Sequence, residues 1–213
     1  DISLSISEHY LPTGLDSRVP RKPYSITLAL TDKIDTLVGF FGINQKPTSS
    51  KDPYALRRSA LGIIRLILEN KKEFKLSHLI NYSVSLYKEQ RFKFHNDNVE
   101  KELSLFLLDR LKFYMKEKDI RYDIIEASIN SFSIDHISKI YNKAFVLNKV
   151  IIKDIGNDII ASYKRASNIL ENELKSKELN LSSSTDPGIF KNEYEKNLYK
   201  KINELRKYFT SIN

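Results

Sequence analysis

The chain has 213 residues, enough for one large or two small domains, and 35 Lys and Arg against 27 Asp and Glu give it a net charge of +8. No apolar run approaches the about 20 residues of a membrane span. Cysteine is absent, which excludes disulfides and thiolate metal sites and fits the reducing cytoplasm where we expect the protein. A basic chain favours a polyanionic partner, but acidic residues are interspersed throughout, so charge alone does not establish nucleic-acid binding. Because the chain starts with Asp and holds one Met, we expect a piece of a longer protein.

Helical periodicity dominates the first half of the chain. A short amphipathic helix is expected before Pro12, and Pro23 begins a second helix that ends at Gly42. A third helix is predicted from Pro53 to about Asn70, with Asp52 as its N-cap. The residues of the second helix that we expect to point inward are Ile26, Leu30, Ile34, Leu37, Val38 and Phe41.

The second half follows the same pattern. Ser77 is an N-cap candidate for a fourth helix, and Asn96 opens a long fifth one. Shorter helices are predicted over 123–130 and 134–152, followed by a break near 153–156. The remaining expectations are a helix through 159–170, a flexible Ser-rich loop over 180–188, and a last helix from Ile189 to about Phe209. Without any strand pair, the predicted fold class is all-α, a multi-helix bundle.

Two adjacent arginines lie on the first turns of the third predicted helix. Arg57 and Arg58 could donate charge-assisted hydrogen bonds to RNA phosphates. They could instead pair with Asp32, Asp35 or Asp52 and fix the preceding loop. Neighbouring helix positions point about 100° apart, so one arginine could do each. We favour structural pairing for at least one of them.

Other cations are candidates for exposed contacts. Lys46 and Lys51 lie in the polar loop before the arginines, where they could meet RNA or another subunit. Lys164, Arg165 and Asn168 form the polar face of the helix through 159–170. That face is either an RNA-binding surface or simply solvated.

No catalytic constellation is discernible. Asp32 and Asp35 lie three residues apart and are expected to share a helix face, either as a carboxylate pair for metal or acid–base work or as ordinary ion-pairing groups. The four histidines, at positions 9, 78, 95 and 136, are isolated, and no zinc motif, phosphate loop or nucleophile elbow is present. We expect neither a catalytic residue nor a metal site in this chain.

Two stretches resemble a known family. The first is the run Ala29-Leu-Thr-Asp-Lys-Ile-Asp-Thr-Leu-Val-Gly39, then Lys46-Pro47, then Lys51-Asp-Pro-Tyr-Ala-Leu-Arg-Arg-Ser-Ala-Leu-Gly62. It resembles the beta subunit of bacterial two-subunit glycyl-tRNA synthetase. Residues 163–170 followed by 193–202 are similar to the start of the anticodon-binding domain that these subunits share with arginyl-tRNA synthetases. The later helices of that domain, with their Asp-Ala-Leu-Arg stretch, are missing from this sequence.

The resemblance implies a domain order. Residues 1–72 would be the C-terminal part of a degenerate HD-like domain, 73–155 a helical body, and 156–213 an incomplete anticodon-binding domain of the Asp-Ala-Leu-Arg type. Asp32 matches the last metal-ligand aspartate of an HD domain, and with Asp35 it would be the acidic remnant of that site. The His-Asp dyad that an active HD site needs does not occur in this sequence.

The resemblance also implies a function. The chain would be a tRNA-recognition portion of a glycine–tRNA ligase, in a cytoplasmic heterotetramer of two alpha and two beta subunits. The alpha subunit would ligate glycine to tRNA(Gly) with ATP and Mg²⁺, so this chain itself would hold no cofactor and no catalytic residue. Two alternatives stay open: a fragment of an HD-type metal-dependent phosphohydrolase, and a helical scaffold without an RNA role.

Overall fold

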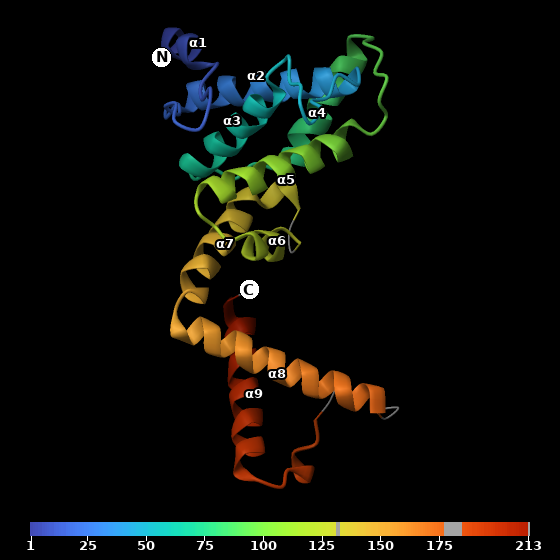
Figure 1. The fold of residues 1–213 in the computed structure, drawn as a ribbon. Coiled ribbons are helices and arrows are strands. Elements are labelled where there is room, and N and C mark those ends of the chain that lie inside the picture. Colours follow the sequence, from blue (N-terminus) through green and yellow to red (C-terminus); the bar gives the residue numbers. More distant parts are fainter. Residues whose placement is uncertain (131–132, 177–184, 213) are drawn as a thin grey trace. The chain divides into compact units, whose positions relative to one another are not determined.

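The fold is all-α, as predicted, over the residues that the computed structural model describes, 1–130, 133–176 and 185–212 (Figure 1). Within these ranges the helices are α1 (Ile2–Glu8), α2 (Pro23–Gly42), α3 (Leu56–Glu69), α4 (Leu76–Glu89), α5 (Val99–Glu117), α6 (Tyr122–Ile129), η1 (Ile134–His136), α7 (Ile137–Ile151), α8 (Asp154–Ser176), η2 (Pro187–Ile189) and α9 (Glu193–Ile212). In the described part of the chain, no helix combines the length and the apolar character that crossing a membrane requires.

The contacts divide the chain into two units, residues 1–158 and 159–213. The first unit is a bundle in which α2 packs on α1, α3, α4 and α5, while α6 and α7 pack on each other and on α5 and α3 respectively. The three-part domain assignment made from the resemblance stays a prediction.

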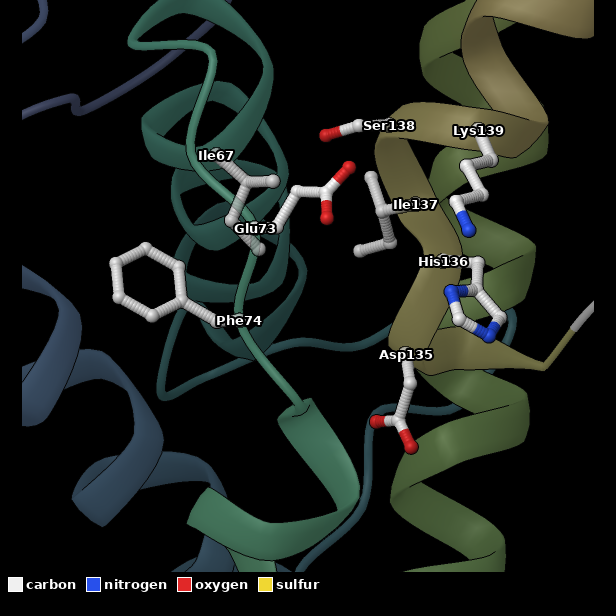
Figure 2. A pocket seen from close by; sticks show the side chains of 8 residues that line it. All are labelled: Ile67, Glu73, Phe74, Asp135, His136, Ile137, Ser138 and Lys139. Carbon is white, nitrogen blue, oxygen red and sulfur yellow. The ribbon is translucent and has the colours of Figure 1, made fainter.

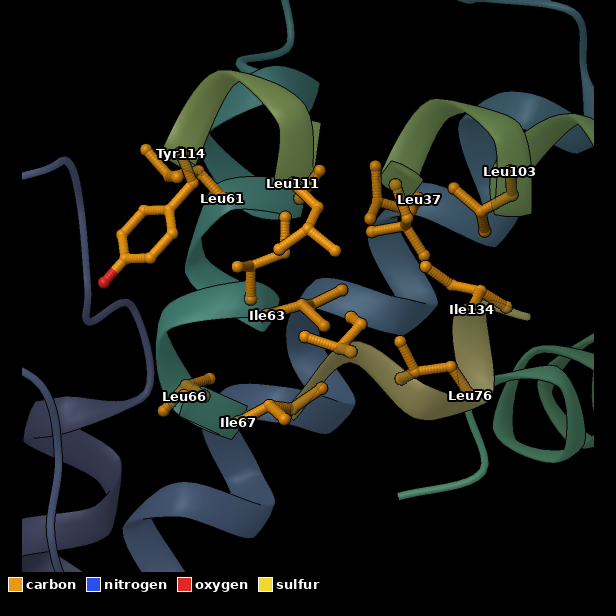
Figure 3. Packing of buried hydrophobic residues seen from close by; sticks show 14 of the residues in the cluster. Leu37, Leu61, Ile63, Leu66, Ile67, Leu76, Leu103, Leu111, Tyr114 and Ile134 are labelled. Carbon is orange, nitrogen blue, oxygen red and sulfur yellow. The ribbon is translucent and has the colours of Figure 1, made fainter. Parts of the chain in front are cut away.

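The core of the first unit lies where α2, α3 and α5 meet (Figure 3). Leu37, Ile63 and Leu111 are among its fully buried side chains. All six residues of α2 that periodicity placed inward are buried, which confirms that prediction. Burial of such a side chain stabilises the fold by roughly 1.5–3 kcal/mol relative to exposure.

In the second unit the apolar residues of the helices are exposed. Ile159, Tyr163 and Leu170 on α8 and Leu198 on α9 all lie at the surface of the chain. The predicted loop over 180–188 falls mostly outside the described residues. The last helix starts at Glu193 rather than Ile189, because Ile189 belongs to the short turn η2, which the Asp186 carboxylate caps through the Gly188 N–H at 2.8 Å.

The predicted start of α3 is wrong by three residues. Pro53 and Tyr54 form a turn in which the Ala55 N–H donates to the Asp52 carbonyl at 3.2 Å, and α3 begins at Leu56. The N-cap is Ala55, in the left-handed conformation with φ of 53°. Asp52 still caps the helix, because its two carboxylate oxygens accept the Leu56 and Arg57 N–H groups at 2.8 and 3.0 Å.

The predicted N-cap of α4 is also wrong. The N-cap is Lys75, and Ser77 lies inside the first turn. Its N–H and its hydroxyl donate to the carboxylate of Asp135, on η1, at 2.8 and 2.7 Å. Figure 2 shows Asp135 beside the start of α4. Asn96 lies three residues before α5 and does not open it, but its side-chain oxygen accepts the Asn98 N–H at 2.9 Å.

Burial of Asp135 opposes its ionisation, but the two Ser77 hydrogen bonds and the nearby His78 and His136 outweigh burial and lower the pKa of its carboxyl. We expect Asp135→Ala to lower the free energy of unfolding by about 0.5–2 kcal/mol at neutral pH, the usual cost of a lost cap. Because the folded pKa lies below the unfolded value, the contribution of the charge is present above about pH 4 and is lost as the pH falls through the folded pKa. Urea unfolding of the native chain and of Asp135→Asn across pH 3–7 measures the contribution of the charge. A difference in unfolding free energy between the two that does not change with pH would contradict a stabilising role of the Asp135 charge.

Candidate nucleic-acid interface

The loop between α2 and α3 is fixed by its own polar groups. The guanidinium of Arg57 donates to the carbonyl of Thr48. The Thr48 N–H donates to the Lys51 carbonyl at 2.9 Å, and the Lys51 N–H donates to the Thr48 hydroxyl at 3.2 Å. Arg57 therefore helps to fix the loop, whereas the ammonium of Lys51 is exposed and has no partner among the described residues.

Lys46 is not a free cation. Its ammonium forms an ion pair with Glu102 at the start of α5. The Asn96 amide also donates to Glu102, at 2.7 Å, and to the Phe41 carbonyl at 3.2 Å. These contacts join the loop to the end of α2, so an RNA phosphate would compete with Glu102 for Lys46.

Arg58 points to a different environment from Arg57. It is exposed and lines an open groove of about 380 Å³ formed by the segment after α1, the middle of α2 and the start of α3. Asp32 and Tyr10 line the same groove. Among the described residues, the Arg58 guanidinium donates no hydrogen bond and forms no ion pair with Asp32, Asp35 or any other carboxylate.

The floor of the groove contains a buried lysine. Lys33 is 4% exposed, and its ammonium donates to the His9 and Tyr10 carbonyls at 3.2 and 3.0 Å. Burial lowers the pKa of Lys33, and the neighbouring Asp32 carboxylate partly offsets this effect. Lys33 crosses α3 at Gly62, where an added Cβ would lie 2.5 Å from its Cε.

Asp32 and Asp35 do not form one site. Asp32 is half-buried in the groove, whereas Asp35 is exposed beside α4 and lines a separate hollow there. Burial, with a contribution from Asp35, raises the pKa of Tyr87 on α4 to about 12. Among the described residues no three His, Cys, Asp or Glu side chains come together as a metal site. That the chain binds no metal stays a prediction.

The polar face of α8 is cationic and unpartnered. Lys164, Arg165 and Asn168 are exposed, and their side chains have no partner among the described residues. Lys164 and Asn168 are four residues apart, so they share a face of the helix. On α9, by contrast, Lys196 and Lys201 form ion pairs with Glu193 and Glu204 at 3.1 and 2.8 Å.

The sequence pattern did not predict that Lys33 and Tyr10 line the groove. Lys33 lies seven residues after Ile26 and four before Leu37, in register with the inward stripe of the helix. A charged residue on the inward face of a helix indicates a buried charge, and this was the signal that could have identified Lys33. Tyr10 carries no such signal, because it follows the end of α1 and reaches the groove through the path of the chain.

Comparison with known proteins gives one family. The family model described as glycyl-tRNA synthetase beta subunit matches residues 1–130. The glycine–tRNA ligase beta subunit of Rickettsia canadensis is 38% identical over 201 residues, which cover 93% of this chain and 28% of that protein. That of Rickettsia typhi is 37% identical over 212 residues, 100% of this chain and 29% of that protein. The beta subunit of Rhodospirillum centenum is 39% identical over 175 residues, which cover 82% of this chain and 24% of that protein. The chain therefore spans less than a third of the length of these relatives.

The two adjacent arginines give a stability test. We expect Arg57→Ala to lower the free energy of unfolding by about 0.5–1.5 kcal/mol, because it removes the hydrogen bond to Thr48. Arg58→Ala, the matched control one position on, should change it by less than about 0.5 kcal/mol, because its guanidinium is exposed and unpartnered. Urea unfolding followed by circular dichroism measures both, and equal losses would contradict the division of roles.

Proposed function

The chain belongs to the family of glycyl-tRNA synthetase beta subunits, and we propose that it forms a tRNA-recognition portion of such a subunit. In this proposal it binds tRNA(Gly), while the alpha subunit ligates glycine with ATP and Mg²⁺. The observation that carries the proposal, beyond the family, is the set of unpartnered cations on α8. We further propose a cytoplasmic assembly of two alpha and two beta subunits.

The chain acts in this reaction by positioning. Lys164 and Arg165 can donate to phosphates without first breaking an ion pair within the chain. The free energy gained when RNA releases its counterions is therefore not reduced by the loss of such a pair. Tyr163, adjacent to them, is 72% exposed and offers a ring for base stacking. Asn168 can donate to and accept from a sugar or base edge. Phosphate contacts of this kind fix the position of the protein on the RNA, and the polar and aromatic groups discriminate between bases.

Replacement of both α8 cations tests the proposal. In the full chain, we expect Lys164→Ala with Arg165→Ala to weaken binding of tRNA(Gly) and to flatten its salt dependence by one to two phosphate contacts, about 0.7–0.9 log units of affinity per contact for each tenfold rise in salt. Helix content should stay unchanged, since Ala is a good helix former. Fluorescence anisotropy with labelled tRNA from 50 to 300 mM KCl gives the slope.

The control is Lys196→Ala with Lys201→Ala, which also removes two cations from the same unit. Both of these are already paired with glutamates, so the slope should change less. If the α8 double variant keeps the native affinity and slope, its polar face is merely solvated and does not bind tRNA.

The division of labour between subunits gives a second test. The chain alone should not catalyse glycine-dependent ATP–pyrophosphate exchange, because no phosphate-binding loop or other ATP-site motif is present in its sequence. Exchange is expected when the alpha subunit is present. Glycine-dependent exchange by the purified chain without an alpha subunit would place activation in the chain itself and overturn this part of the proposal.

A further inference from the structure

The groove beside Lys33 holds two opposite charges that do not pair. Asp32 comes from α2 and Arg58 from α3, and both line the groove. Among the described residues, the Asp32 carboxylate accepts no hydrogen bond, and the Arg58 guanidinium donates none. Asp32 is half-buried, and charges at that depth are normally satisfied by hydrogen bonds, whereas the charged neighbour that it has here is Lys33 on the same helix. Arg58 is exposed, so a ligand with both a donor and an anionic group could reach the two side chains together.

Two tyrosines line the groove. Tyr54 stacks on Phe40 with ring centroids 4.1 Å apart, and Tyr10 packs against His9 at 4.0 Å. The Tyr10 carbonyl also accepts a hydrogen bond from Lys33 at 3.0 Å, which ties the backbone of Tyr10 to α2. Tyr54 is 45% and Tyr10 69% exposed, so a flat ring can reach both, and every nucleobase offers a π-face for stacking.

From this arrangement we propose that the groove binds a single unpaired nucleotide of the tRNA, with its phosphate on Arg58 and an amino group of its base on Asp32. The inference rests on the proposed function, because it takes tRNA as the partner. A volume of about 380 Å³ is large enough for one nucleotide. An ionised carboxylate can only accept hydrogen bonds, so it favours the exocyclic amino group of a base such as cytosine, the pairing that Asp makes with cytosine N4. A carbonyl at the same position of the ring would be repelled.

Asp32→Ala removes both the charge and the acceptor oxygens, and it tests whether the carboxylate contacts a base, because the two possibilities change tRNA affinity in opposite directions. A carboxylate that makes no contact repels a polyanion, so its removal would strengthen tRNA binding or leave it unchanged. If Asp32 accepts a base amino group, the same change should weaken tRNA binding by about 5- to 100-fold, the value of one good base contact. The matched control is Asp35→Ala, which removes the same charge one turn along α2 outside this groove and should not weaken binding.

Arg58→Ala should both weaken binding and reduce the salt slope by about one phosphate contact. Asp32→Ala should weaken binding without reducing that slope, because it removes no phosphate contact. Native or tighter binding by Asp32→Ala refutes the base contact, and an unchanged slope in Arg58→Ala refutes the phosphate contact. Circular dichroism checks that each variant is folded.

A second measurement needs no variant and no tRNA. CMP and UMP differ at position 4 of the same ring, where cytosine carries an amino donor and uracil a carbonyl acceptor. In amide NMR spectra of the full chain, CMP should shift the signals around Asp32, Tyr54 and Arg58 at lower concentration than UMP does. Equal shifts, or shifts outside the groove, would refute the inference even if Asp32→Ala failed to fold.

The two proposals can fail separately. If the α8 double variant loses tRNA binding while the Asp32 and Arg58 variants bind like the native chain, the groove is refuted and the proposed function stands. If the chain binds no tRNA but CMP still shifts the groove signals, the nucleotide site stands and the proposed function fails.

Discussion

A buried cation lies at the crossing of α2 and α3. Lys33 passes α3 at Gly62, where any side chain would collide with its Cε, and its ammonium is satisfied by the carbonyls of His9 and Tyr10. Burial of an unsatisfied charge costs far more than a typical mutation. The segment after α1 must therefore stay against α2, since it supplies these acceptors. Arg65 acts in parallel on α3, because its guanidinium donates to the Gly14 carbonyl in the same connector. The hydrogen bonds of Lys33 and Arg65 hold this connector against α2 and α3, and the groove lies between the three.

Helix starts show what local sequence determines and what it does not. The inward face of α2 follows from periodicity and a proline at the first position, and both are properties of consecutive residues. The start of α4 depends on Asp135, which lies 58 residues after Ser77 in the chain. No local pattern contains that information. The start of α3 lies between these cases: Asp52 was recognised as a cap, but the left-handed Ala55 that delays the helix is a conformation few non-glycine residues adopt.

The candidate binding residues also show which features follow from local sequence and which depend on the fold. Positive charges were found by reading the sequence, yet their partners come from the fold. Lys46 meets Glu102, and Arg57 meets the Thr48 carbonyl, so both contribute to the structure of the loop. Arg58, one residue later, is left free. The net charge of +8 therefore does not say which cations are free to bind a ligand, and the unpartnered subset is what a phosphate backbone would meet first.

Affinity and discrimination make different demands on a nucleic-acid site. Phosphate contacts need exposed, unpartnered cations and tolerate mobility, because each is a point charge against a regular backbone. The polar face of α8 has this character. A base contact needs an acceptor held in place beside a stacking surface, because hydrogen bonds weaken steeply with misalignment. In the proposed nucleotide site, Asp32 would be that acceptor, and it lies on the helix that Lys33 ties to the segment after α1 through two hydrogen bonds. In that proposal the groove would contribute selectivity, and the buried lysine would hold together the elements that form it.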